Sequence, residues 1–195
     1  MSRRDPYEVL GVDEEAPQES ITKAYRTRAQ RLHPDRNQDP GAEAMMQELT
    51  EAYERIGDAD RRLEFDALGD GALVPIEEAA KASLEALFES ALDQDEEISI
   101  LLRARMVLDL ALRDYADQVA THEAKQRQLK GKRRKVRRRG APGPNIVDAM
   151  IDRRIRGISK ELVRLRRQQE IHKVVRAMLL EFEEVQLGPE LDLDD

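Results

Sequence analysis

The chain has 195 residues, of which 37% are charged and 4% aromatic, and it contains neither cysteine nor tryptophan. This composition favours helices with apolar stripes and excludes disulfides and thiolate zinc sites. No stretch approaches the roughly 20 apolar residues that span a bilayer. The first residues lack the apolar run of a secretory signal, so we expect a cytoplasmic protein.

The net charge of -7 conceals segments of opposite sign. Residues 1–70 carry -7 and residues 71–96 carry -6, whereas residues 97–139 carry +8. Residues 140–186 carry +2, and the tail over 187–195 carries -4. The distribution of charge therefore says more about partners than the total does.

The pattern over residues 1–70 predicts a small helical domain. Asp5 is a candidate N-cap for a short helix that ends at Gly11. A second helix is expected from about Pro17 to Leu32. It should stop there because Pro34 forces the preceding residue out of the α region.

A third helix is expected from the apolar spacing in threes and fours that follows. Its stripe consists of Ala42, Met45, Leu49, Ala52 and Ile56. A turn over residues 58–60 should lead into a last short helix over residues 61–68. The two longer helices can bury their stripes against each other while the first helix closes one side, which makes a four-helix domain.

Beyond this domain the pattern stays helical. Residues 75–92 predict one helix, and a second begins near Ile98 and continues into a basic run. Gly and Pro residues over 140–144 interrupt the pattern. Asn145 can then cap a final helix that reaches about Val185.

The simplest fold for these helices is an antiparallel hairpin over residues 97–186 with a basic tip at 125–144. Its base is apolar over too wide a face for a two-helix seam. We therefore expect the linker and packing segment, residues 71–96, to complete a three-helix base. A dimeric coiled coil is the alternative. The fold class is all-α, and residues 187–195 form an acidic tail.

Five stretches of the N-terminal domain belong together: Asp5–Val12, Lys23–Arg26, His33–Asn37, Glu51–Tyr53 and Arg62–Asp66. In this order and spacing they resemble the J domain, the defining module of the DnaJ family, over about a third of the chain. Leu32 departs from the family pattern, which usually has an aromatic residue before the histidine, but a leucine can still pack. The remainder lacks the Gly/Phe-rich and cysteine-rich regions of full-length DnaJ. The chain thus resembles the heterogeneous class that shares only the J domain.

The resemblance implies a co-chaperone. J domains dock on the ATP-bound state of a DnaK-type (70-kDa heat-shock) chaperone and stimulate its ATP hydrolysis. Carried over to this chain, the implied chaperone-binding residues are His33, Pro34, Asp35, Lys23, Arg26 and Arg31. The first three would form the stimulatory loop, and the cations would steer toward an acidic surface of the partner. No nucleophile-base group or Gly-rich phosphate loop appears, so we expect no catalysis, cofactor or metal in this chain. The resemblance implies instead an activator of a partner ATPase.

The basic run over residues 125–139 contains ten cations and no acid. Its candidate anion-binding residues are Lys130, Lys132, Arg133, Arg134, Lys135, Arg137, Arg138 and Arg139. No aromatic side chain is available there to stack on bases, so RNA or DNA would be held through phosphates. On this alternative the chain is a nucleic-acid or ribonucleoprotein factor with an accessory J domain.

Other interpretations of the run stay open. It could be a solvated loop, it could meet an acidic protein surface or the acidic segments at 93–97 or 190–195, or, in a eukaryote, it could direct nuclear import. His122 and His172 lack metal-ligand spacing and are expected on the surface or in the helix seam. An exposed client-binding groove at the base is less expected than ordinary helix packing.

Overall fold

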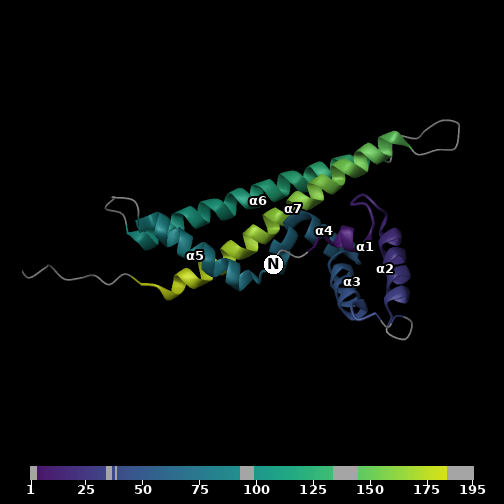
Figure 1. Ribbon diagram of the computed structural model, residues 1–195. Helices are drawn as coiled ribbons and strands as arrows, with labels where there is room; N and C mark the ends of the chain where they lie inside the picture. Colours follow the sequence, from purple (N-terminus) through teal and green to yellow (C-terminus); the bar gives the residue numbers. More distant parts are fainter. Residues whose placement is uncertain (1–3, 34–36, 38, 93–98, 134–144, 184–195) are drawn as a thin grey trace, which may run out of the picture. The chain divides into compact units, whose positions relative to one another are not determined.

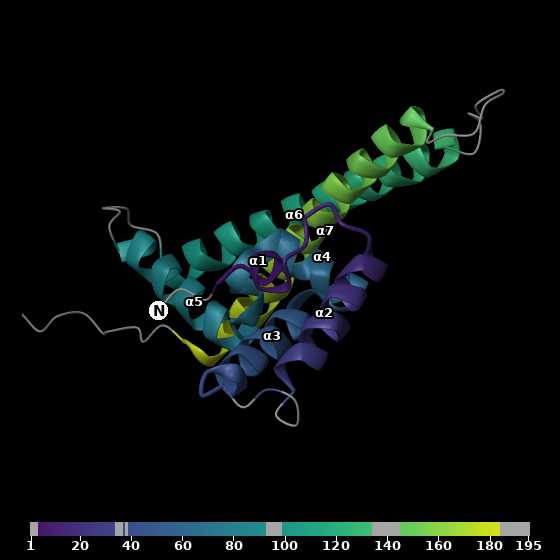
Figure 2. The ribbon, with the colours of Figure 1, turned by 45° about the vertical axis from the view of Figure 1, so that its right-hand side comes forward.

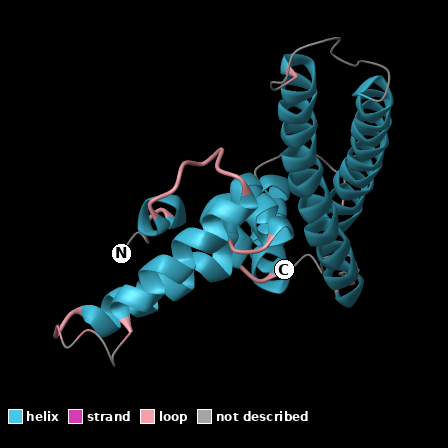
Figure 3. Ribbon diagram, turned by 90° about the vertical axis from the view of Figure 1, so that its right-hand side faces the viewer, coloured by secondary structure: helices cyan, strands magenta, loops and turns pink. Residues whose placement is uncertain are grey.

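The computed structural model describes residues 4–33, 37, 39–92, 99–133 and 145–183. Figure 3 shows helices joined by loops across these residues, without a strand. The predicted all-α class is therefore confirmed. Among the described helices, none combines the length and the apolar character that crossing a membrane requires.

Contacts divide the chain into two units. The first comprises Met1–Ala72 with Ser159–Val163, and the second comprises Leu73–Ile158 and Arg164–Asp195. The helices of the N-terminal segment are α1 (Pro6–Leu10), α2 (Gln18–Leu32), α3 (Ala42–Ile56) and α4 (Ala59–Leu68), followed by a 3-10 turn over Gly69–Leu73.

Local chemistry sets both ends of α1. The Asp5 side chain accepts a 2.9 Å hydrogen bond from the Tyr7 amide, and Pro6 occupies the first turn. Gly11 ends the helix in the left-handed region with φ of 61°. The Arg28 guanidinium of α2 donates a 2.6 Å hydrogen bond to the Val9 carbonyl. The predicted cap and terminator are both observed.

One core joins the first three helices. Its buried residues are Tyr7, Leu10, Ile21, Leu49, Ala52 and Ile56. Leu32 packs against this core, as expected for a leucine at that position. Met45, which the stripe placed with the core, is instead 57% exposed. Met46, one position along α3, packs against the core instead.

The last short helix begins earlier than predicted. The segment assigned to a turn is the first part of α4, which starts at Ala59. Asp58 caps it by accepting hydrogen bonds from the amides of Asp60 and Arg61. Because an Asp side chain serves a helix N-terminus as well as a turn, the sequence signal is ambiguous here.

The remaining helices are α5 (Ile76–Leu92), α6 (Ile100–Arg133) and α7 (Ile146–Met178), with a 3-10 turn over Leu179–Glu181. Figures 1 and 2 show α6 and α7 lying side by side as a long hairpin. The last helix ends at Met178, before the predicted end, and Val185 lies outside the described residues. Ile98 and residues 140–144 also lie outside them.

The predicted three-helix base is confirmed. One cluster of buried residues draws on α5, α6 and α7: Ala80, Ala104, Leu108, Ile171, Val175 and Leu179. The rings of Phe88 and Phe182 meet edge to face at 5.3 Å between centroids. The Arg167 guanidinium donates to the Val74 carbonyl just before α5.

Pairs of residues along the hairpin define its antiparallel register. Near the base Arg176 Nε lies 3.4 Å from Asp109 Oδ1, and the rings of Tyr115 and His172 stack at 5.3 Å. Farther along, Arg166 Nη2 lies 2.7 Å from Glu123 Oε1. Arg133 Nη1 lies 2.9 Å from Asp152 Oδ1 at the far end of α6. Each pair joins positions that one continuous register brings opposite each other.

Candidate functional site

The candidate loop begins where α2 ends. His33 is the C-cap residue, exposed, with φ of -59° and ψ of 131°. This extended conformation is the one that a following proline imposes. The Asn37 amide donates a 2.9 Å hydrogen bond to the His33 carbonyl. Pro34 and Asp35 lie outside the described residues.

Lys23 and Arg26 lie together on the outer face of α2. Both are exposed and line an open hollow of about 410 Å³, whose other walls are polar residues of the same helix. Ile21 turns the opposite side of this helix into the core. Because positions three apart are neighbours on a helix surface, the two cations form one positive patch on this face of α2.

Arg31 is separated from that pair. It lines a second hollow, of about 430 Å³, together with residues of α1 and α3, among them Met45 and Leu49. The rim of this hollow carries an ion pair between Arg4 and Glu48. The structure therefore brings two of the three predicted steering cations together and sets the third on another side of α2.

A polar network centred on Arg62 fixes the start of α2, and we did not anticipate it from the sequence. The Arg62 guanidinium donates to the carbonyls of Ala16 and Glu14, at 2.8 and 2.7 Å, and to the Tyr7 hydroxyl at 3.0 Å. Gln18 in turn donates 2.8 Å to the Ile56 carbonyl. These bonds fasten the loop before α2 to α1, α3 and α4. In the sequence, Arg62 appeared only as the start of the Arg62–Asp66 stretch, and nothing there indicated which groups its guanidinium would bind.

Four short helices around one core, with His33-Pro34-Asp35 directly after the second helix, define the J-domain class. Residues 5–66 match the family model described as the DnaJ domain, and they are a J domain. The core of the first three helices and the Arg62 network thus belong to one J domain, which occupies about a third of the chain.

Curated relatives match the same region. The chain is 51% identical over 73 residues to the "Chaperone protein DnaJ" of Cereibacter sphaeroides (strain KD131 / KCTC 12085), covering 37% of this chain and 19% of that protein. It is 46% identical over 69 residues to the protein of the same description from Lactiplantibacillus plantarum, covering 35% of this chain and 18% of that protein. The chain therefore spans about a fifth of the length of these relatives, and the similarity covers its J domain alone.

The hairpin carries the second candidate site. Lys130, Lys132 and Arg133 are exposed near the end of α6. Arg133 pairs with Asp152, while the Lys130 ammonium donates to the Gln126 side chain at 3.3 Å. The other predicted anion-binding residues, Arg134, Lys135, Arg137, Arg138 and Arg139, lie outside the described residues.

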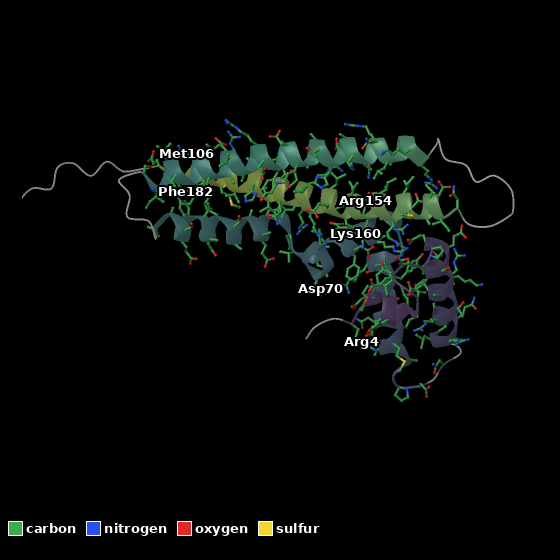
Figure 4. All side chains as sticks on the ribbon, turned by 90° about the horizontal axis from the view of Figure 1, so that it is seen from above. Arg4, Asp70, Met106, Arg154, Lys160 and Phe182 are labelled. Atoms are coloured by element: carbon green, nitrogen blue, oxygen red, sulfur yellow. The ribbon has the colours of Figure 1, made fainter. Side chains whose placement is uncertain are left out.

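The beginning of α7 adds three exposed cations that the sequence analysis did not assign to a site: Arg153, Arg154 and Arg156. Their separation from the basic run by more than a dozen residues concealed the relationship. Figure 4 shows Arg154 toward one end of the hairpin and Met106 and Phe182 toward the other. The antiparallel register is what brings the two basic segments to the same end.

The histidines of the hairpin serve packing and local hydrogen bonding. The His172 ring stacks on Tyr115, and burial lowers the pKa of its imidazole. His122 Nδ1 lies 2.8 Å from the Gln118 carbonyl. Within the described part of the chain, no group of three or more His, Asp or Glu side chains could hold a metal ion.

Proposed function

We propose that this protein is a co-chaperone that binds the ATP-bound state of a DnaK-type (70-kDa heat-shock) chaperone and stimulates its ATP hydrolysis. The observation that carries the proposal is the J domain over residues 5–66 with an uninterrupted His33-Pro34-Asp35 sequence. The relatives named above are chaperone proteins DnaJ, which supports the same activity. On this view the protein activates a partner ATPase and performs no chemistry of its own.

The described surface fits such docking. Lys23 and Arg26 present two positive charges side by side, and exposed His33 leads from the same helix into the loop. Cations on the rim of an interface mainly accelerate encounter, because they attract an acidic partner over about a Debye length. Asp35 can pair with an arginine of the partner, and Pro34 limits the conformational entropy lost on binding. A J domain shifts its partner's equilibrium only through a difference in affinity between the partner's states.

Single-turnover ATP hydrolysis by a DnaK-type chaperone tests the proposal. The wild-type chain should accelerate hydrolysis, and His33→Gln and Asp35→Asn should each abolish the acceleration. Equal rates with all three proteins would reject it. Each substitution keeps the approximate size of the side chain, so unfolding of the domain is not expected to explain a loss.

The steering cations need a charge-matched control. Replacing Lys23 and Arg26 by Gln should weaken stimulation most at low salt, because screening removes the same attraction at high salt. Replacing Lys81 and Arg113, which are exposed on α5 and α6, removes the same charge outside the J domain. If both double variants lose stimulation equally, net charge rather than the α2 face is responsible.

The helical hairpin would direct this activity to a target. Its cations at the far end of α6, Lys130, Lys132 and Arg133, are exposed and support an anionic target. Fusing the J domain's activity to a separate recognition arm would place the partner chaperone where the arm binds. Replacing these cations of the hairpin by neutral residues should then leave stimulation of the ATPase in solution intact.

A further inference from the structure

The hairpin register brings cations of α6 and α7 to the same level. Arg133 faces Asp152, and Glu123 faces Arg166 ten residues earlier on α6. Between these two pairs the same register sets Lys132 level with Arg154 and Lys130 level with Arg156. Helix packing thus concentrates like charges from two segments that the sequence keeps apart.

Few carboxylates compensate these charges. From Lys125 to Arg133, α6 has five cations and no acid, while Ile146–Ile158 of α7 has three arginines and two aspartates. Arg133 and Arg127 have ion-pair partners, in Asp152 and Glu123. Six exposed cations have no carboxylate partner within the described part of the chain, namely Lys125, Lys130, Lys132, Arg153, Arg154 and Arg156. We call these six residues the arm cluster.

Concentrated like charge destabilises a helical hairpin unless an anion is near. The described base of the hairpin does not share this excess, since α5 has four acids and one lysine, and Asp109, Asp114 and Asp117 offset the arginines of α6. From Lys160 to Arg176, α7 also has six cations and two acids, but positive charge is densest at the far end, where α6 has no acid. This density favours a binding site for an anionic polymer over a role in solubility alone.

The chemistry of the arm cluster selects the class of anion. No Phe, Tyr or Trp occurs between Tyr115 and Phe182, so the far end of the hairpin has none of these large rings on which an unpaired base could stack. Recognition must then rest on phosphates alone, and a duplex offers them at the highest linear density, about one charge per 1.7 Å. The cluster extends ~10.5 Å along α6, over which a duplex carries about six phosphate charges.

We propose that the arm cluster, formed jointly by α6 and α7, binds the phosphate backbone of double-stranded nucleic acid independently of sequence. This inference rests on the proposed targeting role of the hairpin and names the target. Asp152 pairs with Arg133, which is not part of the arm cluster, so its charge does not compensate the six cations that would bind the ligand. Contacts to phosphates position a protein without reading bases, so affinity should depend on salt and not on sequence.

Fluorescence anisotropy of the full-length chain with labelled 20-base-pair duplexes tests the inference. The key variant replaces Arg153, Arg154 and Arg156 by Gln, which removes three charges from exposed helical positions and preserves helix propensity. Its affinity should fall about tenfold or more near 0.1 M salt. The slope of log K against log salt should become shallower by about 2 to 3.

A charge-matched variant provides the control. Replacing Lys81, Arg105 and Arg113 by Gln removes the same charge from exposed positions at the base. This control should change affinity by no more than about twofold, because the lost charges lie beyond a Debye length of the arm cluster. An equal loss in both triple variants would show that net charge alone governs binding and would overturn the proposal.

The choice of probe separates the remaining outcomes. DNA and RNA duplexes of one sequence distinguish the two sources of the same phosphate chemistry, and tight salt-dependent binding of either supports the proposal. A single strand of equal length that binds as tightly as the duplex would overturn it. So would labelled polyglutamate of equal charge that binds as tightly, because an acidic protein surface would then suffice.

ATPase stimulation by the same proteins separates this inference from the proposed co-chaperone activity. The arm variant should lose duplex binding and keep full stimulation, whereas His33→Gln should do the reverse. If wild type binds duplex but fails to stimulate the chaperone, the co-chaperone proposal fails and the arm-cluster proposal stands. If it stimulates without binding duplex, only the arm-cluster proposal fails.

Discussion

The Tyr7 hydroxyl donates a 2.6 Å hydrogen bond to Asp66 Oδ1, which joins α1 to the last turn of α4. Arg62 donates to the same hydroxyl at 3.0 Å. Tyr7 is 4% exposed, and burial together with the Asp66 hydrogen bond raises the pKa of its phenol. The short α1, which could not be stable alone, is thus joined to α4 by a neutral hydroxyl as well as by the Tyr7 ring, over which the Arg62 guanidinium lies.

Tyr7→Phe should therefore destabilise the J domain by about 1–2 kcal/mol, because Asp66 and Arg62 both lose a partner in a mostly buried place. Hydrogen exchange of the α3 amides in the full-length chain would measure the change. Tyr25→Phe is the matched control, since its ring stacks on Tyr53 at 4.0 Å and its hydroxyl makes no bond to the described residues. If both substitutions have equal effects, the hydroxyl bond is not what holds α1.

Gly11→Ala should destabilise the same domain. The residue has φ of 61°, and an added Cβ would collide with the Arg28 guanidinium. We expect a loss of about 1–2 kcal/mol from the left-handed backbone, with a further cost from displacing Arg28 from the Val9 carbonyl. Urea unfolding followed by circular dichroism would report it.

The opposite sign is expected at Gly157, within α7, where an added Cβ meets nothing within 4 Å. Gly157→Ala should stabilise the hairpin by about 0.5–1 kcal/mol, because alanine restricts the unfolded chain and favours helix. Equal signs for the two substitutions would contradict the conformational explanation.

The three-helix base should depend on Leu108, which is 2% exposed. Leu108→Ala removes buried apolar volume and should cost about 2–4 kcal/mol of unfolding free energy. Leu110→Ala, two residues along the same helix, should have almost no effect because Leu110 is 70% exposed. Thermal unfolding of both variants checks the difference, and comparable losses would mean that α6 is packed differently.

The stability of the hairpin should fall in mild acid. Burial lowers the pKa of His172 below its ordinary value of 6.5, so the unfolded chain binds this proton more readily than the folded chain. The contribution of a neutral His172 is complete above pH 6.5 and is lost as the pH falls from there through the folded pKa. His172→Gln should reduce the difference in urea midpoint between pH 7.5 and pH 5.5. An unchanged difference would assign the acid sensitivity to other groups.

Features set by local chemistry were predictable. Caps at Asp5 and Asn145 follow from side chains that accept nearby amides, and Gly11 ends a helix because glycine adopts positive φ at little cost. The extended conformation of His33 follows from the next residue alone. For the same reason the J domain could be recognised from five short stretches. Met45 was misplaced because its burial depends on whether another helix covers it, which helical spacing does not reveal.

The sequence by itself determined that this protein is helical, that it carries a J domain, and that its charge is unevenly distributed. Only the tertiary structure decided which distant groups meet. Arg62 reaches the carbonyls of Glu14 and Ala16, and the arginines at the start of α7 come level with the lysines at the end of α6. Local propensity acts over a few residues, whereas the register of a hairpin is set by packing and ion pairs between residues up to 67 positions apart.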